Sequence, residues 1–199
     1  MRYFKQLKAV LFLVCLYPLS NLLWLAYNNQ LGANPIELIT RSLGTWTLVF
    51  LMITLSITPL RKLSGWTWLI KLRRMIGLYA FFYALLHFIT YIWLDQFFDL
   101  HEIYKDVIKR PFITIGFAAF VLLIPLAITS TNSMMKRLGG KRWLLLHRLV
   151  YLIAIFGVLH YWWLVKKDIT QPLIYAAVLT TLLGYRLVIN KFKNAKTLN

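Results

Sequence analysis

The sequence predicts an all-α integral membrane protein, a bundle of six transmembrane helices with both termini in the cytoplasm. Of its 199 residues, 60% are hydrophobic and the mean hydropathy is +0.65, values typical of membrane proteins. All six acidic residues fall in three short segments, which alternate with strongly basic ones. Cytoplasmic loops retain Lys and Arg during insertion, so this alternation predicts both the number of spans and their direction.

Each span needs about 20 mainly apolar residues. The first candidate follows Arg2, Lys5 and Lys8 as a signal peptide would. However, it is long enough to cross the membrane and no Ala-x-Ala cleavage site follows, so we expect an uncleaved helix. Prolines near the ends of later candidates mark helix boundaries, where a missing N–H is tolerated. The six expected spans are residues 9–27, 43–60, 75–94, 112–129, 143–165 and 171–190.

The basic residues predict which end of each span faces the cytoplasm. The predicted cytoplasmic segments hold 17 of the 23 Lys and Arg residues: Arg2, Lys5, Lys8, Arg61, Lys62, Lys71, Arg73, Arg74, Lys136, Arg137, Lys141, Arg142, Arg148, Arg186, Lys191, Lys193 and Lys196. The outer segments hold the acidic residues Glu37, Asp95, Asp99, Glu102, Asp106 and Asp168. Because six spans use nearly the whole chain, we expect a single membrane domain over residues 1–199.

Composition also excludes some classes of function. The net charge is +17, but the basic residues flank apolar runs and form no stripe on a soluble domain. We therefore expect contact with anionic membrane lipid and no nucleic-acid partner. Cys15 is the only cysteine and lies in the first span, which excludes a disulfide framework and a cysteine-based metal site.

Three of the four histidines lie in predicted spans, where an ionisable residue indicates a functional site. From the cytoplasmic ends of their spans, His87 lies about 18 Å and His160 about 25 Å along, and His147 only about 6 Å. His87 and His160 therefore share the outer half of the membrane, on two helices. Two facing imidazoles in a helix bundle can ligate a haem iron from both sides.

The inner histidine has no histidine partner in the pattern. Arg73, fourteen residues before His87, lies on nearly the same face of the third span. On a straight fifth span His147 and His160 would point about 140° apart. Facing one neighbouring helix together would therefore require a distortion, which we expect at Gly157. The fourth histidine, His101, is expected to be an ordinary exposed residue in the acidic outer segment.

The intramembrane histidines are also compatible with roles that involve no haem. Each could simply hydrogen-bond to a neighbouring helix. A six-span transporter could use histidines to relay protons, although no carboxylate lies in any predicted span to assist. Zinc fits less well than haem, because a zinc site normally needs three or four protein ligands.

Four segments resemble the MsrQ family, the haem-binding membrane subunits of bacterial periplasmic methionine sulfoxide reductase systems. They are RRMIGLYAFFYALLHFITY (73–91), KRPFITIGF (109–117), LAITSTNSMMKRLGGKRWLLLHRLVYLIAIFGVLHYWW (126–163) and QPLIYA (171–176). The resemblance covers most of the chain from Leu31 to Tyr185. This family belongs to the wider group of ferric reductases and NADPH oxidases, which hold b haems between spans three and five.

The resemblance implies an outer haem b whose iron is held by His87 and His160. His147 matches a ligand of a second, inner haem, but Arg73 stands where that site has its other histidine, so the number of haems stays open. The family also implies a place in the bacterial inner membrane and a periplasmic, molybdenum-containing methionine sulfoxide reductase subunit as partner. Electrons for the repair of oxidised periplasmic proteins would come from the quinol pool or a cytoplasmic flavin reductase. FMN has been associated with the family.

Two charged groups have alternative interpretations. Arg73 and Arg74 either only set the topology or form a positively charged binding site for a flavin phosphate or haem propionates. The acidic outer segment, from Asp95 to Asp106, is either a solvated loop or a docking surface for the periplasmic partner. A stand-alone transmembrane cytochrome with another acceptor, either a ferric reductase or a quinol-oxidising protein, is the alternative within electron transfer.

Overall fold

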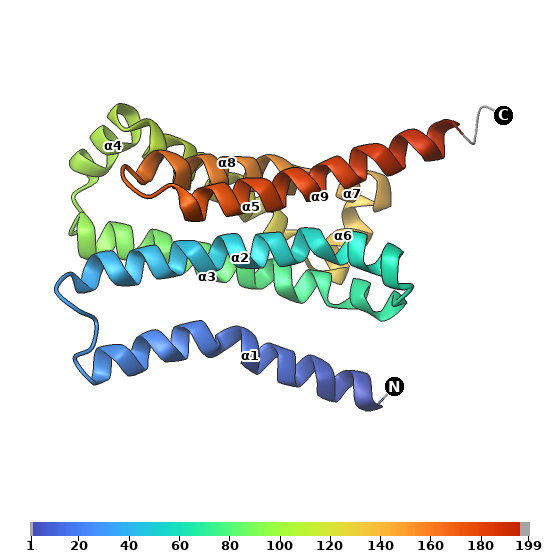
Figure 1. The fold of residues 1–199 in the computed structure, drawn as a ribbon, viewed down its shortest axis with the longest axis horizontal. Coiled ribbons are helices and arrows are strands. Elements are labelled where there is room, and N and C mark those ends of the chain that lie inside the picture. The colour runs from blue at the N-terminus through green and yellow to red at the C-terminus, as the bar shows by residue number, and fades with distance from the viewer. Residues whose placement is uncertain (1, 196–199) are drawn as a thin grey trace.

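The computed structural model describes residues 2–195, and the side chains of residues 3–189. Met1 and residues 196–199, including Lys196 of the predicted cytoplasmic segment, lie outside the described part. Within it, every regular element is helical (Figure 1). The membrane-length elements are α1 (Arg2–Tyr27), α2 (Pro35–Ser64), α3 (Arg73–Thr90), α5 (Pro111–Ile128), α7 (Gly140–His147) followed by α8 (Leu149–Leu164), and α9 (Thr170–Ala195).

Six stretches in the described residues are long and apolar enough to cross a membrane, and each contains or closely matches one predicted span. The all-α, six-span prediction is therefore confirmed. A π-helical turn, η2 (Tyr91–Asp95), extends α3 at its outer end. The main difference lies in the second span, where α2 covers 30 residues because Asn34 caps its first turn and Gly65 ends it in the left-handed conformation.

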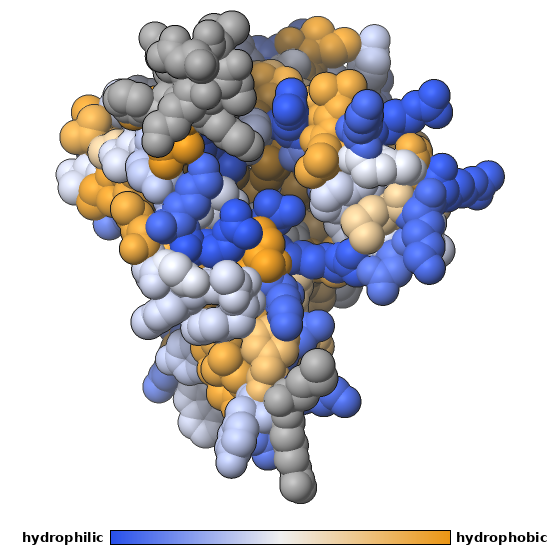
Figure 2. Space-filling view, turned by 90° about the vertical axis from the view of Figure 1, so that its right-hand side faces the viewer, coloured by the Kyte–Doolittle hydropathy of each residue, from blue (hydrophilic) through white to orange (hydrophobic). Residues whose placement is uncertain are grey.

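Both ends of the described chain lie at the same end of the bundle (Figure 1). The connection between α2 and α3, with the short η1 (Thr67–Lys71), and α6 (Asn132–Leu138) lie at this end too. Figure 2 views the bundle from this side, where hydrophilic side chains gather. This arrangement agrees with the predicted sorting of basic segments, and the assignment of this end to the cytoplasm stays a prediction.

Helix α2 lies at the centre of the bundle and packs against α3, α8 and α9. Its buried side chains include Leu43, Leu48, Leu51 and Leu55, spaced three to five residues apart along one side. Ile153 and Ala154 of α8 are almost completely buried in the same core. Because α2 contacts both the α3 side and the α8 side, it fixes the separation between the two helices that carry His87 and His160.

Helix α1 is attached to the rest of the bundle through two tyrosines of α3. The Tyr79 hydroxyl donates to the Phe12 carbonyl at 2.8 Å. The Tyr83 hydroxyl, which is completely buried, donates to the Cys15 carbonyl at 2.8 Å and accepts from the Leu19 amide at 3.3 Å. These two backbone groups flank Pro18, whose missing N–H interrupts the hydrogen bonds of α1.

The fifth span is interrupted, but not where the sequence indicated. The break between α7 and α8 lies at Arg148, whose amide bonds to Leu145 three residues earlier and whose carbonyl accepts from Tyr151 three residues later. The expectation of a distortion at Gly157 was therefore wrong. Gly157 lies within regular helix, and a Cβ there would be 2.9 Å from Leu48 Cδ2, so this glycine lets α8 approach α2 closely.

The acidic outer segment forms helix α4 (Leu100–Lys109), which Asp99 caps by accepting from the amides of His101 and Glu102. His101 is exposed, as expected. The solvated-loop interpretation fails for Asp106, which is 7% exposed. Its carboxylate pairs with Arg110 at 3.2 Å and accepts from Gln96 at 3.2 Å. These bonds hold α4 against the outer ends of α3 and α5.

Candidate functional site

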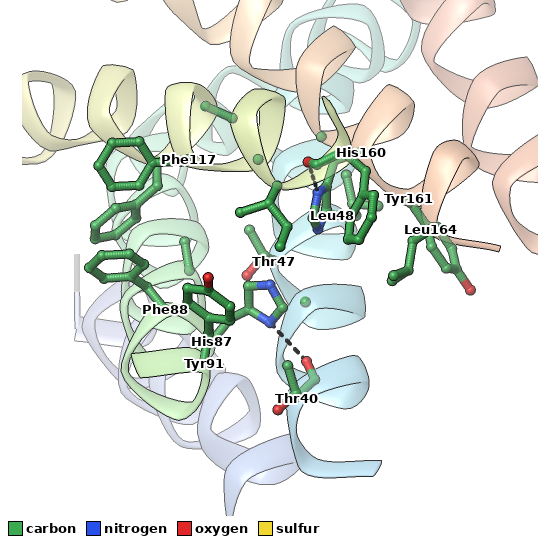
Figure 3. A pocket seen from close by; sticks show the side chains of 18 of the residues that line it. Thr40, Thr47, Leu48, His87, Phe88, Tyr91, Phe117, His160, Tyr161 and Leu164 are labelled. Atoms are coloured by element: carbon green, nitrogen blue, oxygen red, sulfur yellow. Dashed lines mark hydrogen bonds between the residues drawn. The ribbon is translucent and has the colours of Figure 1, made fainter. Parts of the chain in front are cut away.

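A cavity of about 350 Å³ lies between α2, α3, α5 and α8, towards the outer ends of these helices. Ligand pockets in proteins usually have volumes of about 300–1,000 Å³. His87 of α3 and His160 of α8 both line it, as Figure 3 shows. Leu48, Phe88 and Phe120 contribute to a mostly apolar wall, and Phe88 stacks on Phe120 at 4.5 Å where α3 meets α5.

The two histidine rings face each other across this cavity. Their centroids are 6.1 Å apart, and the ring planes are inclined at 76°. A bond between a metal and an imidazole nitrogen is about 2 Å long, so two rings on opposite sides of one metal have centroids about 6 Å apart. The observed separation therefore fits one metal ion held between the two rings.

Backbone carbonyl groups set the tautomer of both rings. Nδ1 of His87 is 2.8 Å from the Thr40 carbonyl oxygen, and Nδ1 of His160 is 2.6 Å from that of Phe112. A carbonyl can only accept, so each Nδ1 carries the proton and each Nε2 keeps its lone pair. Metal-ligating histidines typically have such a second bond, which orients the ring.

Haem suits this pair better than a bare metal ion. No group of three or more His, Cys, Asp or Glu side chains that could hold a metal occurs in the described residues. Zinc bound only by His87 and His160 would lack the third and fourth ligands that it normally takes. Haem iron already has four porphyrin nitrogens and needs only two axial ligands, and the apolar wall suits a porphyrin face.

Two glycines that sequence reasoning missed lie against the histidines. An ideal Cβ on Gly44 of α2 would be 3.1 Å from His87 Cε1, and one on Gly116 of α5 would be 2.6 Å from His160 Nδ1. The sequence did contain one signal for them. Glycine destabilises a helix interior, so a glycine inside an apolar span usually indicates a place where another group packs closely. The sequence could not indicate which histidine each glycine faces.

His147 is separate from this pair and does not line the cavity. Its Nε2 is 3.1 Å from Thr129 Oγ1, and its ring stacks on Trp143 with centroids 3.9 Å apart. The Thr129 hydroxyl has one proton, which it directs to the Pro125 carbonyl at 2.6 Å, so it accepts from Nε2–H of His147. This histidine therefore has its Nε2 proton engaged within the protein.

Arginines surround His147 at the end of the bundle that holds both termini. Arg73 and Arg74 are close enough for their charges to act on His147, and those of Arg61 and Arg186 act on Arg73. The guanidinium of Arg186 donates to the Leu55 carbonyl and the Tyr151 hydroxyl, both at 2.6 Å. All ion pairs among the described residues lie in the outer segments, so no carboxylate bridge neutralises this cluster.

The structure thus separates the predicted site residues into two groups. His87 and His160 share the outer cavity, whereas His147, Arg73 and Arg74 lie together at the opposite end. Arg61 and Arg186 join the inner group, which sequence reasoning had not included. Their membership follows from how α3 and α9 both pack against α2, and this packing has no local sequence signal.

Similarity to known proteins agrees with this arrangement. Residues 42–158 match the family described as "Ferric reductase like transmembrane component". A protein of Herminiimonas arsenicoxydans named "Protein-methionine-sulfoxide reductase heme-binding subunit MsrQ" is 62% identical over 90% of this chain and 84% of its own length. Proteins with the same name from Azospira oryzae and Ralstonia nicotianae are 55% and 54% identical, over 94% and 92% of this chain and 81% and 86% of theirs.

These similarities extend over nearly the whole chain. The family match includes His87 and His147 and ends two residues before His160, whereas the pairwise similarities cover at least nine-tenths of the sequence. The identities are far above the level at which a shared fold is certain. Together with the six apolar helices, they identify a multi-pass membrane protein. The chain belongs to the ferric reductase-like transmembrane family and, within it, to the MsrQ proteins.

Proposed function

We propose that this chain binds haem b through His87 and His160 and is the electron-transfer subunit of a methionine sulfoxide reductase system in the bacterial inner membrane. The observation that carries the proposal is the pair of imidazoles 6.1 Å apart across one cavity, with both Nε2 lone pairs free. The name of the relatives, a heme-binding subunit of this system, supports the same assignment. The chain acts as one membrane domain.

Haem supplies one-electron transfer when bound, and the residues of the chain set its place and surroundings. His87 and His160 would hold the haem through Nε2, while the carbonyl groups of Thr40 and Phe112 keep the rings in the required tautomer. Leu48 and Phe88 contribute apolar surface to the cavity wall, against which a porphyrin would pack. The outer rim includes Tyr91 and Arg110, so the site lies close to the surface where a periplasmic protein would dock.

The inner group is the proposed entry point for electrons. Arg73 and Arg74, with Arg61 and Arg186, form a cationic region next to His147 without a carboxylate bridge. Such a region favours an anionic group, such as the phosphate of FMN. The donor is either membrane quinol or a cytoplasmic flavin reductase. We assign one haem to the chain, because Nε2–H of His147 is engaged by Thr129.

The proposed acceptor is a periplasmic, molybdenum-containing methionine sulfoxide reductase subunit, so that the complex repairs oxidised periplasmic proteins. Its docking surface includes α4 and the outer end of α3, which lie beside the rim of the haem cavity. Reduction of the purified partner by the reduced chain tests this assignment. A reduced chain that transfers electrons to ferric iron but not to the partner would favour the stand-alone cytochrome.

An absorption spectrum of the purified, haem-supplied protein tests the central proposal. The wild type should give the low-spin spectrum of a bis-imidazole b haem, and His87→Ala or His160→Ala should each abolish it. His101→Ala, at an exposed position on α4, is the matched control and should retain it. A colourless wild type would remove the proposal and favour a histidine-based proton-coupled transporter. A low-spin spectrum retained in either variant would remove that ligand.

A further inference from the structure

We infer that Gly44 and Gly116 are positioning residues that orient the two haem ligands through one arrangement used twice. This inference rests on the proposed binding of haem by His87 and His160. In each half of the site, one helix carries the histidine and its neighbour carries a carbonyl acceptor with a glycine four residues later. The two halves are α2 with α3, and α5 with α8.

In the first half, His87 of α3 donates from Nδ1 to the Thr40 carbonyl of α2 at 2.8 Å. In an α-helix, the carbonyl of a residue points towards the residue four positions later, which here is Gly44. The imidazole therefore lies over position 44. A Cβ there would be 3.1 Å from Cε1 and 3.2 Å from Nδ1, so the ring would have to move by a few tenths of an ångström.

In the second half, His160 of α8 donates from Nδ1 to the Phe112 carbonyl of α5 at 2.6 Å. Gly116 again follows four residues later. Here a Cβ would be 2.6 Å from Nδ1 and 2.8 Å from Cε1, distances that Cβ atoms do not adopt. A side chain at position 116 is thus incompatible with the bond between His160 and Phe112.

The same geometry predicts opposite effects of alanine on the helix and on the site. Alanine favours a helix interior more than glycine, so substitution alone would stabilise α2 or α5. At position 116 the alanine side chain must instead displace the His160 ring. The ring then loses its Nδ1 hydrogen bond and the orientation in which it would ligate the haem. At position 44 a smaller displacement rotates the His87 ring about its bond to Thr40. Gly116→Ala should therefore remove a ligand, whereas Gly44→Ala should alter the angle between ligand planes.

The experiment compares four glycine variants of the full-length, haem-supplied protein by absorption and electron paramagnetic resonance spectroscopy. The test variants are Gly116→Ala and Gly44→Ala. The controls are Gly77→Ala on α3, where the nearest atom is Thr54 Cγ2 at 3.7 Å, and Gly184→Ala on α9, where a Cβ would meet no atom within 4 Å. Both controls add a methyl group inside a membrane-length helix without touching a histidine or the cavity wall.

Gly116→Ala should lose most of the low-spin signal, with high-spin or unbound haem in its place. Gly44→Ala should keep a low-spin haem with shifted g values, because the g anisotropy of a bis-imidazole haem depends on the angle between the ligand planes. The two controls should match the wild type. Near-perpendicular planes, at 76° here, should give the wild type a strongly anisotropic low-spin signal.

A Gly116→Ala protein with the wild-type low-spin signal would overturn the inference. If that variant fails to accumulate, Gly44→Ala decides: shifted g values support the inference, and values equal to those of the wild type and of Gly77→Ala overturn it. A wild type without any bis-imidazole signal would instead be a failure of the proposed haem binding itself. The two failures are therefore distinguishable by the wild-type spectrum alone.

Discussion

His147 and Thr129 are joined by a 3.1 Å hydrogen bond through Nε2, the nitrogen that His87 and His160 leave free. The three intramembrane histidines thus differ in tautomer. A backbone carbonyl accepts from Nδ1 in the outer pair, whereas a side-chain hydroxyl accepts from Nε2 at the inner position. The outer pair thus keeps both Nε2 lone pairs available, as the proposed haem ligation requires, whereas the inner histidine donates a hydrogen bond from Nε2.

His147→Ala should therefore leave the haem content of the protein at one per chain and the low-spin spectrum unchanged. The physical reason is that its Nε2 is already bonded and its ring lies outside the cavity of His87 and His160. Haem per chain, measured by the pyridine haemochrome assay against protein concentration, checks this. Loss of about half of the haem would show that His147 holds a second one.

Arg73→Ala should weaken binding of an anionic cofactor such as FMN about tenfold or more, the effect of losing a charge-assisted hydrogen bond. The outer haem spectrum should stay as in the wild type, because Arg73 does not line that cavity. Flavin content after purification and equilibrium binding of FMN are the measurements. Lys62→Ala, which removes an exposed cation from the same end, is the control. Equal flavin binding in Arg73→Ala and the wild type would limit Arg73 to a topological role.

Tyr83→Phe should lower the free energy of unfolding by about 1 kcal/mol, the typical size of an interhelical hydrogen bond in a membrane. The change removes the hydroxyl that bonds the Cys15 carbonyl and the Leu19 amide beside Pro18. Unfolding in mixed micelles with increasing sodium dodecyl sulfate measures it. Tyr17→Phe, at a position 64% exposed on α1, should change stability much less. Equal effects of the two substitutions would contradict a specific role of Tyr83.

The predicted orientation can be tested with single cysteines, because Cys15 is the only native one and is buried. In a Cys15→Ala background, Glu102→Cys on α4 should react with a membrane-impermeant maleimide in cells whose inner membrane is intact. Lys62→Cys lies near the C-terminal end of α2, at the end of the bundle that holds both termini. It should react only after that membrane is permeabilised. The reverse pattern would place both termini outside. Labelling measured by gel shift gives the answer for each position.

Prediction from the sequence succeeded where the signal is local along the chain. Hydropathy over about 20 residues and the position of basic residues located all six spans, because the membrane forces each segment to satisfy its own backbone hydrogen bonds. Helical rise then placed His87 and His160 at similar depth, and the structure brings them into one cavity. Both inferences need only one helix at a time.

The errors arose where local backbone geometry depends on neighbours. The fifth span is broken at Arg148 rather than Gly157, because Gly157 is used for close packing against Leu48 instead of for a distortion. The solvated-loop alternative for the acidic segment fails at Asp106, because the π-helical turn η2 and helix α4 bring Gln96 and Arg110 to its carboxylate. Neither outcome has a signature in the residues immediately around it.

Span number, sorting of charge and the depth of each histidine are properties of single segments, so composition and spacing were sufficient to obtain them. The partners of each ring were not obtained in this way. Thr40 with Gly44 and Phe112 with Gly116 lie more than 40 residues from the histidines that they contact, and Thr129 at the end of α5 contacts His147 across the α6 connection. Helix packing selects them, because the azimuth of a helix in a bundle depends on side-chain contacts summed over its whole length. That azimuth gives two histidines a free Nε2 towards a common cavity and leaves the third bonded to threonine.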